Sequence, residues 1–465
     1  MKKTKIGFLP LYIKLYDDCG SGAKARPRLE PFADRLVGEL EARNFEVVAV
    51  PFCRIKEEFK AAIAKFESEG CKAVVTWHAA YSPSLECIEA LAGTKLPLIV
   101  LDTTETYAMG PTLEQFEISL CHGIHGVMDM CSMLRRYGKA FAIAAGHIDH
   151  SDVMDRIAGY TRAAVAATSL DGTSTGSIGG SFDGMGDFLV SDEEMLERFG
   201  VKVVYPEAGE LAKYRAEVDE ADVKAEMQKD NETCYQIEPV DPTSHERTVR
   251  NCLAVRRWIE EKNLSAMTIN FREITEATGL EIMPFMEACK AMARGTGYAG
   301  EGDVLTASLV GALMKGFDET AFIEIFCPDW KGNTLLLSHM GEFNPALSSG
   351  KSGMKEIPFI YGDAKNPVVC YGRYKGGEAV FLNLYRSKDG FRLILSDVDM
   401  VEVRPDDDTL EVRVRGWMKP RMPIADFLEA ISRVGATHHS ALVYGAKVEQ
   451  MVYFAELLGL DYDIV

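Results

Sequence analysis

Short apolar runs alternate with amphipathic stretches along the first third of the chain. The runs are typical of buried strands, and the stretches between them repeat apolar residues with the period of a helix. The predicted strands are residues 5–12, 46–52, 73–77, 97–101 and 140–145. The predicted helices are residues 28–43, 55–69, 83–92 and 113–137. This alternation predicts a parallel α/β domain over residues 1–170.

A second α/β domain is predicted over residues 171–320. Its predicted strands are residues 201–205 and 266–271, and a strand end with a turn is predicted at 176–180. Its predicted helices are residues 248–262 and 282–294. The polar and charged segment 218–247 is expected to be exposed.

The pattern changes after about residue 320, where strand-like runs follow one another without long helices. These runs are residues 322–326, 333–338, 368–374, 379–384, 392–403 and 409–417, and two late helices are predicted at 424–434 and 447–458. Consecutive strands joined by turns favour an antiparallel sheet or barrel. The predicted fold class is therefore α/β, with two parallel-sheet domains followed by a β-rich antiparallel C-terminal domain over residues 321–465.

Composition narrows the classes of partner. The 465 residues carry a formal net charge of −19, which disfavours nucleic acid and anionic membranes as partners. The eleven cysteines include no C-x-x-C pair, so reduced and mostly buried thiols are expected rather than a disulfide framework. No run of 18 apolar residues and no signal-peptide pattern is found, so we expect a cytoplasmic protein that handles small neutral molecules or cations.

A few ionisable residues of the second half stand out by their surroundings. Glu301 lies in a predicted loop before a helix, and Glu324 lies inside an apolar strand. His339 follows a predicted strand, and His438 and His439 open an apolar run. Taken singly, each has an ordinary structural explanation, such as a strand glutamate that faces solvent. The residues alone leave the functional and the structural interpretation open.

The motifs around these residues resemble those of the L-arabinose isomerase family. Residues 297–303 resemble the first glutamate motif of that family, residues 322–324 its second glutamate, residues 338–342 its first histidine, and residues 435–439 its terminal His-His motif. The motifs occur in the order of the family. The N-terminal segment 8–12 departs from the family pattern, and residues 184–188 are similar to the wider group that includes L-fucose isomerases.

The resemblance implies a set of site residues and a cofactor. It implies four ligands for Mn²⁺ or another divalent cation, which are Glu301, Glu324, His339 and His439. It implies that Glu324 moves the carbon-bound proton and Glu301 the hydroxyl proton. The implied substrate-binding residues are His438, Phe271 and Met185; for Phe271 and Met185, a role in the hydrophobic core is an equally good explanation.

These residue types suit an aldose–ketose isomerisation. The reaction moves one proton between C1 and C2 and another between O1 and O2, and a divalent cation stabilises the enediolate charge as a Lewis acid. Two carboxylates can share the proton transfers as base and acid. The alternatives are an isomerase of another pentose, a deoxyhexose or a branched sugar, or a non-catalytic sugar-binding protein on the same scaffold. The resemblance also implies a homo-oligomer, a trimer or hexamer, in which the first domain completes the site of a neighbour.

Overall fold

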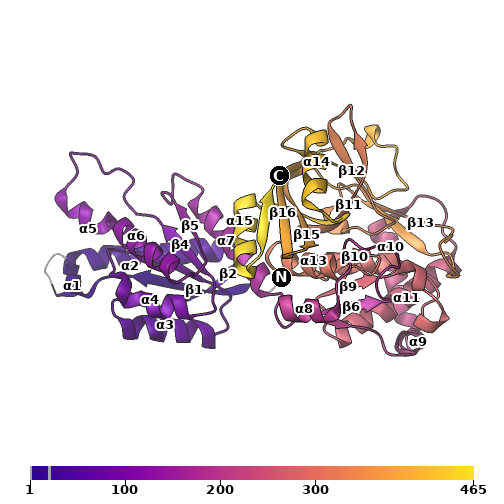
Figure 1. The fold of residues 1–465 in the computed structure, drawn as a ribbon, viewed down its shortest axis with the longest axis horizontal. Coiled ribbons are helices and arrows are strands. Elements are labelled where there is room, and N and C mark those ends of the chain that lie inside the picture. The colour runs from indigo at the N-terminus through magenta and orange to yellow at the C-terminus, as the bar shows by residue number, and fades with distance from the viewer. Residues whose placement is uncertain (1–2, 19–21) are drawn as a thin grey trace. The chain divides into compact units, whose positions relative to one another are not determined.

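The chain divides into two compact units in the computed structural model, which describes residues 3–18 and 22–465. Unit 1 spans Met1–Thr168 and unit 2 spans Ser169–Val465. Figure 1 shows the elements of unit 1 in indigo and purple and those of unit 2 in magenta to yellow.

Unit 1 is built on a five-stranded parallel sheet with the strand order β2-β1-β3-β4-β5. The strands are β1 (Thr4–Leu11), β2 (Phe45–Ala49), β3 (Val74–His78), β4 (Leu98–Asp102) and β5 (Phe141–Ala145). The helices are α1 (Lys14–Asp17), α2 (Gly22–Ala42), α3 (Lys56–Ser68), α4 (Ser84–Gly93), η1 (Gln115–Glu117), α5 (Ile118–Cys121), α6 (Ile124–Arg136) and α7 (Val153–Thr168). Helix α4 packs against α3 and α6, and α2 packs against α7. The predicted parallel α/β architecture is confirmed.

The predicted single helix over residues 113–137 is wrong. The structure divides it into η1, α5 and α6, and the backbone leaves the helical region at His122. Gly123 precedes α6, and a Cβ atom at this position would lie 2.3 Å from the backbone oxygen of His78. The break therefore serves a close approach of the chain to the end of β3, which the local hydrophobic period cannot reveal.

Unit 2 contains a four-stranded parallel sheet with the order β10-β9-β6-β7. Its strands are β6 (Ser174–Ile178), β7 (Lys202–Val204), β9 (Ala266–Ile269) and β10 (Gly297–Gly300). The accompanying helices are α8 (Asp192–Phe199), α9 (Glu210–Ala216), α10 (Glu220–Thr233), α11 (Pro242–Glu261), η2 (Phe271–Glu273), η3 (Glu276–Thr278), α12 (Phe285–Ala293) and α13 (Val304–Gly316). Helix α13 is apolar on all sides, as expected for a helix enclosed by protein, and it packs against β9 and β10.

The polar segment 218–247 contains more regular structure than its composition predicts. It includes α10 and the first residues of α11, and most side chains of α10 are exposed as expected. Asp219 and Asp241 cap the two helices by accepting hydrogen bonds from the N–H groups of Ala221 and Thr243. Such caps are a sequence signal for helix starts that could have identified both elements.

The rest of unit 2 is a β-rich region whose large sheet closes on itself. Its order is β15-β18-β11-β12-β17-β16-β19, and β15 also pairs with β16, so that six strands form a barrel with β19 at its side. The strands are β11 (Thr320–Asp329), β12 (Thr334–Leu337), β15 (Gly377–Ser387), β16 (Gly390–Met400), β17 (Gly416–Pro420), β18 (His439–Tyr444) and β19 (Asp461–Ile464). The barrel strands pair antiparallel, as predicted, whereas β19 pairs parallel with β16.

A smaller sheet with the order β14-β13-β8 joins distant segments of unit 2. Its strands are β8 (Cys234–Gln236), β13 (Ser352–Glu356) and β14 (Val368–Tyr371), and the remaining helices are η4 (Pro345–Leu347), η5 (Pro405–Asp407), α14 (Ile424–Val434) and α15 (Val448–Leu458). The division of unit 2 at residue 320 into a central and a C-terminal domain stays a prediction.

The predicted strand over residues 409–417 is wrong, since β17 begins only at Gly416. The chain before it surrounds a buried ion-pair cluster. The Asp408 carboxylate lies 2.9 Å from a guanidinium nitrogen of Arg373 and 2.6 Å from one of Arg415. We attribute the loop to this cluster, because a buried carboxylate needs its cationic partners around it.

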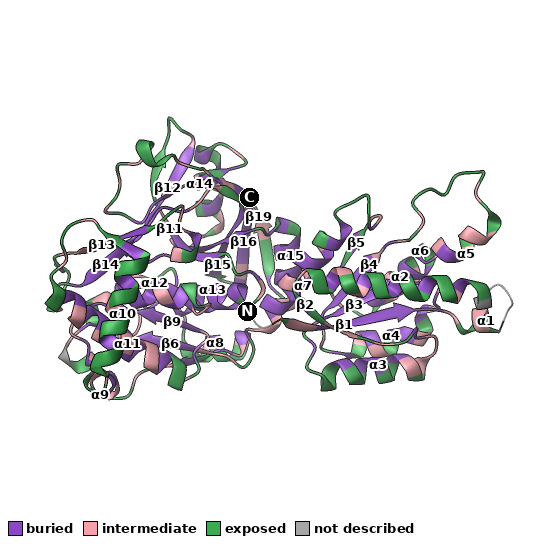
Figure 2. Cartoon of the chain, turned by 180° about the vertical axis from the view of Figure 1, so that it is seen from behind, coloured by how far each residue is buried: buried purple, intermediate pink, exposed green. Residues whose placement is uncertain are grey.

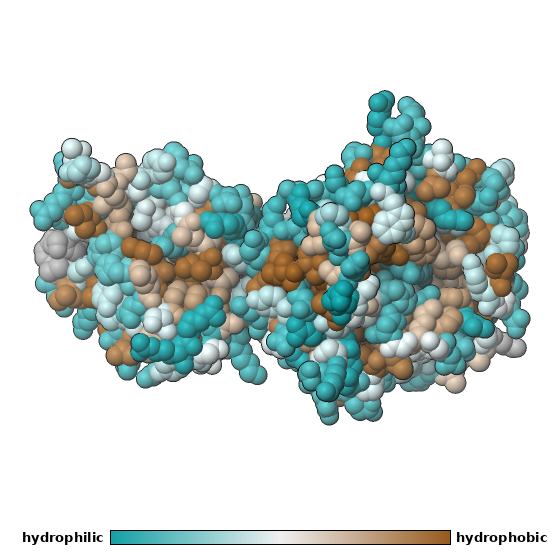
Figure 3. All heavy atoms as spheres, turned by 45° about the horizontal axis from the view of Figure 1, so that its top comes forward, coloured by the Kyte–Doolittle hydropathy of each residue, from teal (hydrophilic) through white to brown (hydrophobic). Residues whose placement is uncertain are grey.

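Figure 2 shows the buried strands in purple and the outer faces of many helices in green, and Figure 3 shows hydrophobic side chains among the polar surface of both units.

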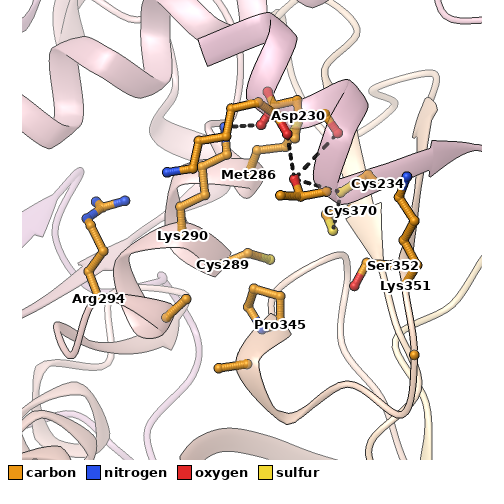
Figure 4. A pocket seen from close by; sticks show the side chains of 15 residues that line it. Asp230, Cys234, Met286, Cys289, Lys290, Arg294, Pro345, Lys351, Ser352 and Cys370 are labelled. Carbon is orange, nitrogen blue, oxygen red and sulfur yellow. Dashed lines mark hydrogen bonds and ion pairs between the residues drawn. The ribbon is translucent and has the colours of Figure 1, made fainter. Parts of the chain in front are cut away.

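The ten cysteines within the described residues are free, and seven of them are buried. This confirms the expectation of mostly buried thiols without a disulfide framework for these ten; Cys19 lies outside the described residues. Figure 4 shows Cys234, Cys289 and Cys370 beside a cavity of about 410 Å³. Among the described helices, none has the length and hydrophobicity that a membrane span requires.

Candidate active site

The pairing of the strands brings the predicted ligands together within unit 2. Glu324 of β11 lies directly opposite His439 of β18 in the antiparallel register. His339 follows β12, the other neighbour of β11. Glu301 follows β10 in the left-handed backbone region, with φ 63°. Such a conformation is uncommon for a residue other than glycine and is found where the surrounding structure holds it, often in functional sites.

The four side chains converge with their nitrogen and oxygen atoms close to one another. The Nε2 atom of His339 lies 3.6 Å from Oε2 of Glu324, and Nε2 of His439 lies 3.6 Å from Oε2 of Glu301. Two overlapping groups are present, Glu324 with His339 and His439, and Glu301 with His438 and His439. In each group, one potential ligand atom from every residue lies within 4.8 Å of those of the other two. The structure therefore places all four predicted metal ligands in one cluster, with His438 at its edge.

Each of the three histidines has a carboxylate at its Nδ1 atom. Nδ1 of His439 lies 3.0 Å from Asp303, and Nδ1 of His438 lies 2.7 Å from Asp187. His339 pairs through Nδ1 with Glu342, three residues further along the chain. Carboxylate partners of this kind turn the Nε2 atom of a metal-binding imidazole toward the ion.

No role was predicted for Asp187, Asp303 or Glu342 from the sequence. Asp303 and Glu342 lie within the motifs of Glu301 and His339, so their short spacing from a predicted ligand is a signal that could have identified them. Asp187 is more than 250 residues from His438 in sequence, and only the fold reveals its contact.

One buried nitrogen atom makes this cluster suitable for a metal ion. The side chain of His439 is fully buried, and its Nε2 atom has no hydrogen-bond partner among the described residues. A buried polar atom without a partner costs about 1–3 kcal/mol, and a cation beside it would remove that cost. Carboxylate oxygens with imidazole nitrogens are also the donor set that Mn²⁺ and similar ions accept.

The two glutamates differ in their electrostatic surroundings. Burial raises the pKa of Glu324, and the nearby imidazoles of His339 and His439 offset this only in part. Burial acts in the same direction on Glu301, but a hydrogen bond with His438 and the nearby imidazoles hold its pKa below the ordinary value. Burial would lower the pKa of His438, yet its bonds to Asp187 and Glu301 raise it to about 10. Environments that separate two carboxyl pKa values are typical of an acid–base pair.

The glutamates open into a cavity of about 250 Å³. Its lining consists of Phe271, Phe285, Glu301, Glu324, Phe326, His339, Met340, Glu342 and Tyr361. Phe271, for which the sequence left a pocket role and a role in the core open, lies in this lining. Met185 is not among the lining residues; its N–H group donates a hydrogen bond to the Phe182 carbonyl oxygen in the loop before α8. An apolar wall with a few charged groups at one end suits a small polar ligand that must be oriented.

The turn that carries His438 and His439 is held by a buried amide. Asn383 of β15 donates hydrogen bonds from Nδ2 to the carbonyl oxygens of Thr437 and His439, both at 2.8 Å. Its Oδ1 atom accepts a hydrogen bond from the N–H group of Thr437 at 3.1 Å. These bonds fix the backbone that sets the direction of the two imidazoles, and sequence reasoning missed Asn383 because nothing local marks it.

Several known proteins are similar in sequence to this chain along most of its length. An L-arabinose isomerase of Geobacillus kaustophilus (strain HTA426) is 28% identical, with 86% of this chain and 82% of that protein covered. An L-arabinose isomerase of Geobacillus stearothermophilus is 27% identical, with 96% of this chain and 92% of that protein covered. An L-arabinose isomerase of Nocardioides sp. (strain ATCC BAA-499 / JS614) is 25% identical, with 96% of this chain and 91% of that protein covered.

Three family models match successive parts of the chain. They are described as the L-arabinose isomerase N-terminal domain, the L-arabinose isomerase central domain and the L-arabinose isomerase C-terminal domain, and they match residues 25–172, 183–317 and 319–461. Glu301, Glu324, His339, His438 and His439 all lie within the matched regions. The chain therefore belongs to the L-arabinose isomerase family and is an intramolecular oxidoreductase of the aldose–ketose isomerase type.

Proposed function

We propose that this enzyme is a divalent-metal-dependent isomerase that interconverts a small aldose and its ketose through an enediolate. The observation that carries the proposal is the convergence of Glu301, Glu324, His339 and His439 in one cluster, of which Glu301, Glu324 and His339 line the cavity. We propose these four as the metal ligands, with Mn²⁺ as the first ion to test. When bound, the cation supplies Lewis-acid stabilisation of the negative charge that develops on the two sugar oxygens.

The proton transfers are assigned to the two glutamates. We propose that Glu324 removes the carbon-bound proton and returns it to the neighbouring carbon. The raised pKa of Glu324 supports this role, because a stronger base takes a weakly acidic proton more readily. Glu301, whose pKa is lowered, transfers the proton between the two sugar hydroxyl oxygens. The ring of Phe271 and the apolar cavity wall limit the access of water to the reacting atoms.

The side chains beside the glutamates orient the sugar. We propose that His438 contacts a sugar hydroxyl, since its Nε2 atom lies 3.3 Å from Oε2 of Glu301 at the partly exposed edge of the cluster. Met185 stays a weaker proposal for a substrate contact, from the resemblance alone.

L-Arabinose is the first substrate to test, because the relatives described above are named for it. Another pentose, a deoxyhexose or a branched sugar are the other substrates that we propose to test. A panel of aldoses and ketoses assayed with saturating Mn²⁺ tests the function directly. Turnover of at least one sugar is the expected result, and no turnover of any member would contradict the proposal.

We expect Asp303→Asn to weaken Mn²⁺ binding by about 10–100-fold, the usual effect of losing the partner of a metal-binding histidine. Asparagine can still cap α13, where Oδ1 of Asp303 accepts a hydrogen bond from the Thr306 N–H group at 2.8 Å. It is a poor partner for Nδ1 of His439, because its amide can turn an N–H group toward the ring. Calorimetric titration with Mn²⁺ measures the effect.

Asp318→Asn is the matched control for this variant, because it makes the same change at an exposed position of unit 2. It should bind Mn²⁺ like the parent protein. Equal affinities of the Asp303→Asn variant and the control would show that Asp303 does not support the metal site.

We also propose that the protein is a homo-oligomer, a trimer or hexamer as the resemblance implies. Unit 1 offers support, because α4, α5 and α6 carry large exposed apolar side chains, at Leu85, Ile118, Ile124 and Met128. Where such residues form one contiguous patch, they are typical of a surface at which proteins associate. We expect sedimentation at micromolar concentration to show a trimer or hexamer. A fully active monomer under the same conditions would contradict this proposal.

A further inference from the structure

The loop between β6 and α8 holds both histidines of the His-His pair. Oδ2 of Asp187 accepts two hydrogen bonds from His438, one from its backbone N–H group at 2.9 Å and one from Nδ1 at 2.7 Å. The ring of Phe188, the next residue, stacks on the ring of His439 with a centroid distance of 5.2 Å and an angle of 4° between the planes. Two successive side chains of one loop therefore determine where two successive imidazoles lie.

This loop is itself fixed to the metal-ligand segment. The N–H group of Phe182 donates a hydrogen bond to the backbone oxygen of Glu301 at 3.0 Å. Gly302 touches the loop so closely that a Cβ atom there would lie 2.1 Å from the Gly180 oxygen. Asn270 donates a hydrogen bond from Nδ2 to the Ser181 oxygen at 3.2 Å. The loop that carries Asp187 is therefore held against the segment that contains Glu301.

His438 needs such a partner more than the other two histidines do. Its side chain is 34% exposed, whereas those of His339 and His439 are 8% and 0% exposed and packed on all sides. An imidazole at a surface can turn over about its χ2 torsion, which exchanges the positions of its ring nitrogens with those of its ring carbons. The Nδ1 contact with Asp187 selects the orientation in which Nε2 lies 3.3 Å from Oε2 of Glu301.

The carboxylate form of Asp187 is available to do this at neutral pH. Burial would raise the pKa of Asp187, but its hydrogen bonds with His438 lower it to about 2. An ionised acceptor forms shorter and stronger hydrogen bonds than a neutral one. The contact also lies in a half-exposed position, where an ion pair adds little to the free energy of unfolding. The contact between Asp187 and His438 therefore serves mainly to orient the imidazole ring of His438.

We propose that Asp187 is a positioning residue of the active site, which holds the His438 imidazole with Nε2 directed at Glu301 and at the sugar hydroxyl beside it. This inference rests on the proposed function, since it assumes that His438 contacts the substrate. Asp187 itself is not among the residues that line the cavity.

The test is a double-mutant cycle on Asp187 and His438, measured on the best sugar of the panel with saturating Mn²⁺. We expect Asp187→Ala to lower kcat/KM by about 10–100-fold, as removal of an orienting partner does. The longer carboxylate of Asp187→Glu should restore part of this loss. In a His438→Gln background, Asp187→Ala should have little further effect, because residues that act through one another are not additive. Asp183→Ala is the matched control, with the same change at an exposed position of the same loop.

Two readouts separate the possible outcomes. ¹⁵N NMR of labelled histidine reports the hydrogen bonds of the His438 ring nitrogens without substrate. We expect an Nδ1–H group strongly hydrogen-bonded to a carboxylate in the parent and loss of that signature in Asp187→Ala. Additive losses in the cycle, or parent-like activity of Asp187→Ala, would overturn the inference while the proposed function stands. An inactive parent protein would instead overturn the proposed function, and the NMR spectrum would still decide whether Asp187 orients His438.

Discussion

Replacing Glu324 with glutamine is expected to lower isomerase turnover by about 10²–10⁴-fold, the usual value of general-base catalysis. Glutamine has nearly the same size, so the packing of β11 and its pairing with β18 should survive. It cannot accept the carbon-bound proton, and it is a weaker ligand for a divalent cation than a carboxylate. Turnover must therefore be measured with Mn²⁺ at saturation and with the metal content of the variant confirmed.

A matched control is available in the same barrel. Glu378 lies in β15, is exposed, and forms surface ion pairs with Lys447 and Arg421. Glu378→Gln should leave turnover unchanged and shift the free energy of unfolding by no more than about 0.5 kcal/mol. If Glu324→Gln behaves like this control, Glu324 is not the base, and the assignment of the proton transfers fails at its central residue.

The fold could be predicted where one short period dominates the local sequence. The strands of unit 1 are short apolar runs between amphipathic helices, and the parallel sheet follows from that alternation. The helix break at Gly123 and the loop around Asp408 could not be predicted, because a close backbone contact and a buried ion-pair cluster decide them. Both depend on residues that are distant in sequence or in a different element.

For the candidate site, too, contacts between residues distant in sequence could not be predicted. Glu301, Glu324, His339 and His439 were found because short motifs around them resemble a family, while their spacing alone says nothing of a common site. Their convergence follows from strand pairing, which places Glu324 opposite His439. The residues that orient them separate into two kinds. Asp303 and Glu342 lie two or three residues from a ligand and share its motif. Asp187 and Asn383 act across the fold: Asp187 lies in the segment 184–188 that was singled out by resemblance, but its contact with His438 has no local signal, and nothing local marks Asn383.

Removal of the metal ion should abolish turnover, because the glutamates alone cannot stabilise the charge that develops on the sugar oxygens. Lewis-acid stabilisation contributes several kcal/mol, and each 1.36 kcal/mol corresponds to about a tenfold change in rate. We therefore expect protein treated with a chelator and then freed of it to lose turnover by about 10³-fold or more. Addition of Mn²⁺ should restore it.

The structure allows this experiment to distinguish a site-bound ion from a general effect of metal. Elemental analysis of the reloaded protein should give about one ion per chain, as expected for a single site of four ligands. His439→Gln should retain much less Mn²⁺, because His439 belongs to both groups of potential ligands. His150→Gln, an exposed histidine of unit 1, should retain the ion like the parent. Full turnover in protein shown to be free of metal would mean that the cluster of Glu301, Glu324, His339 and His439 has a role other than metal-assisted isomerisation.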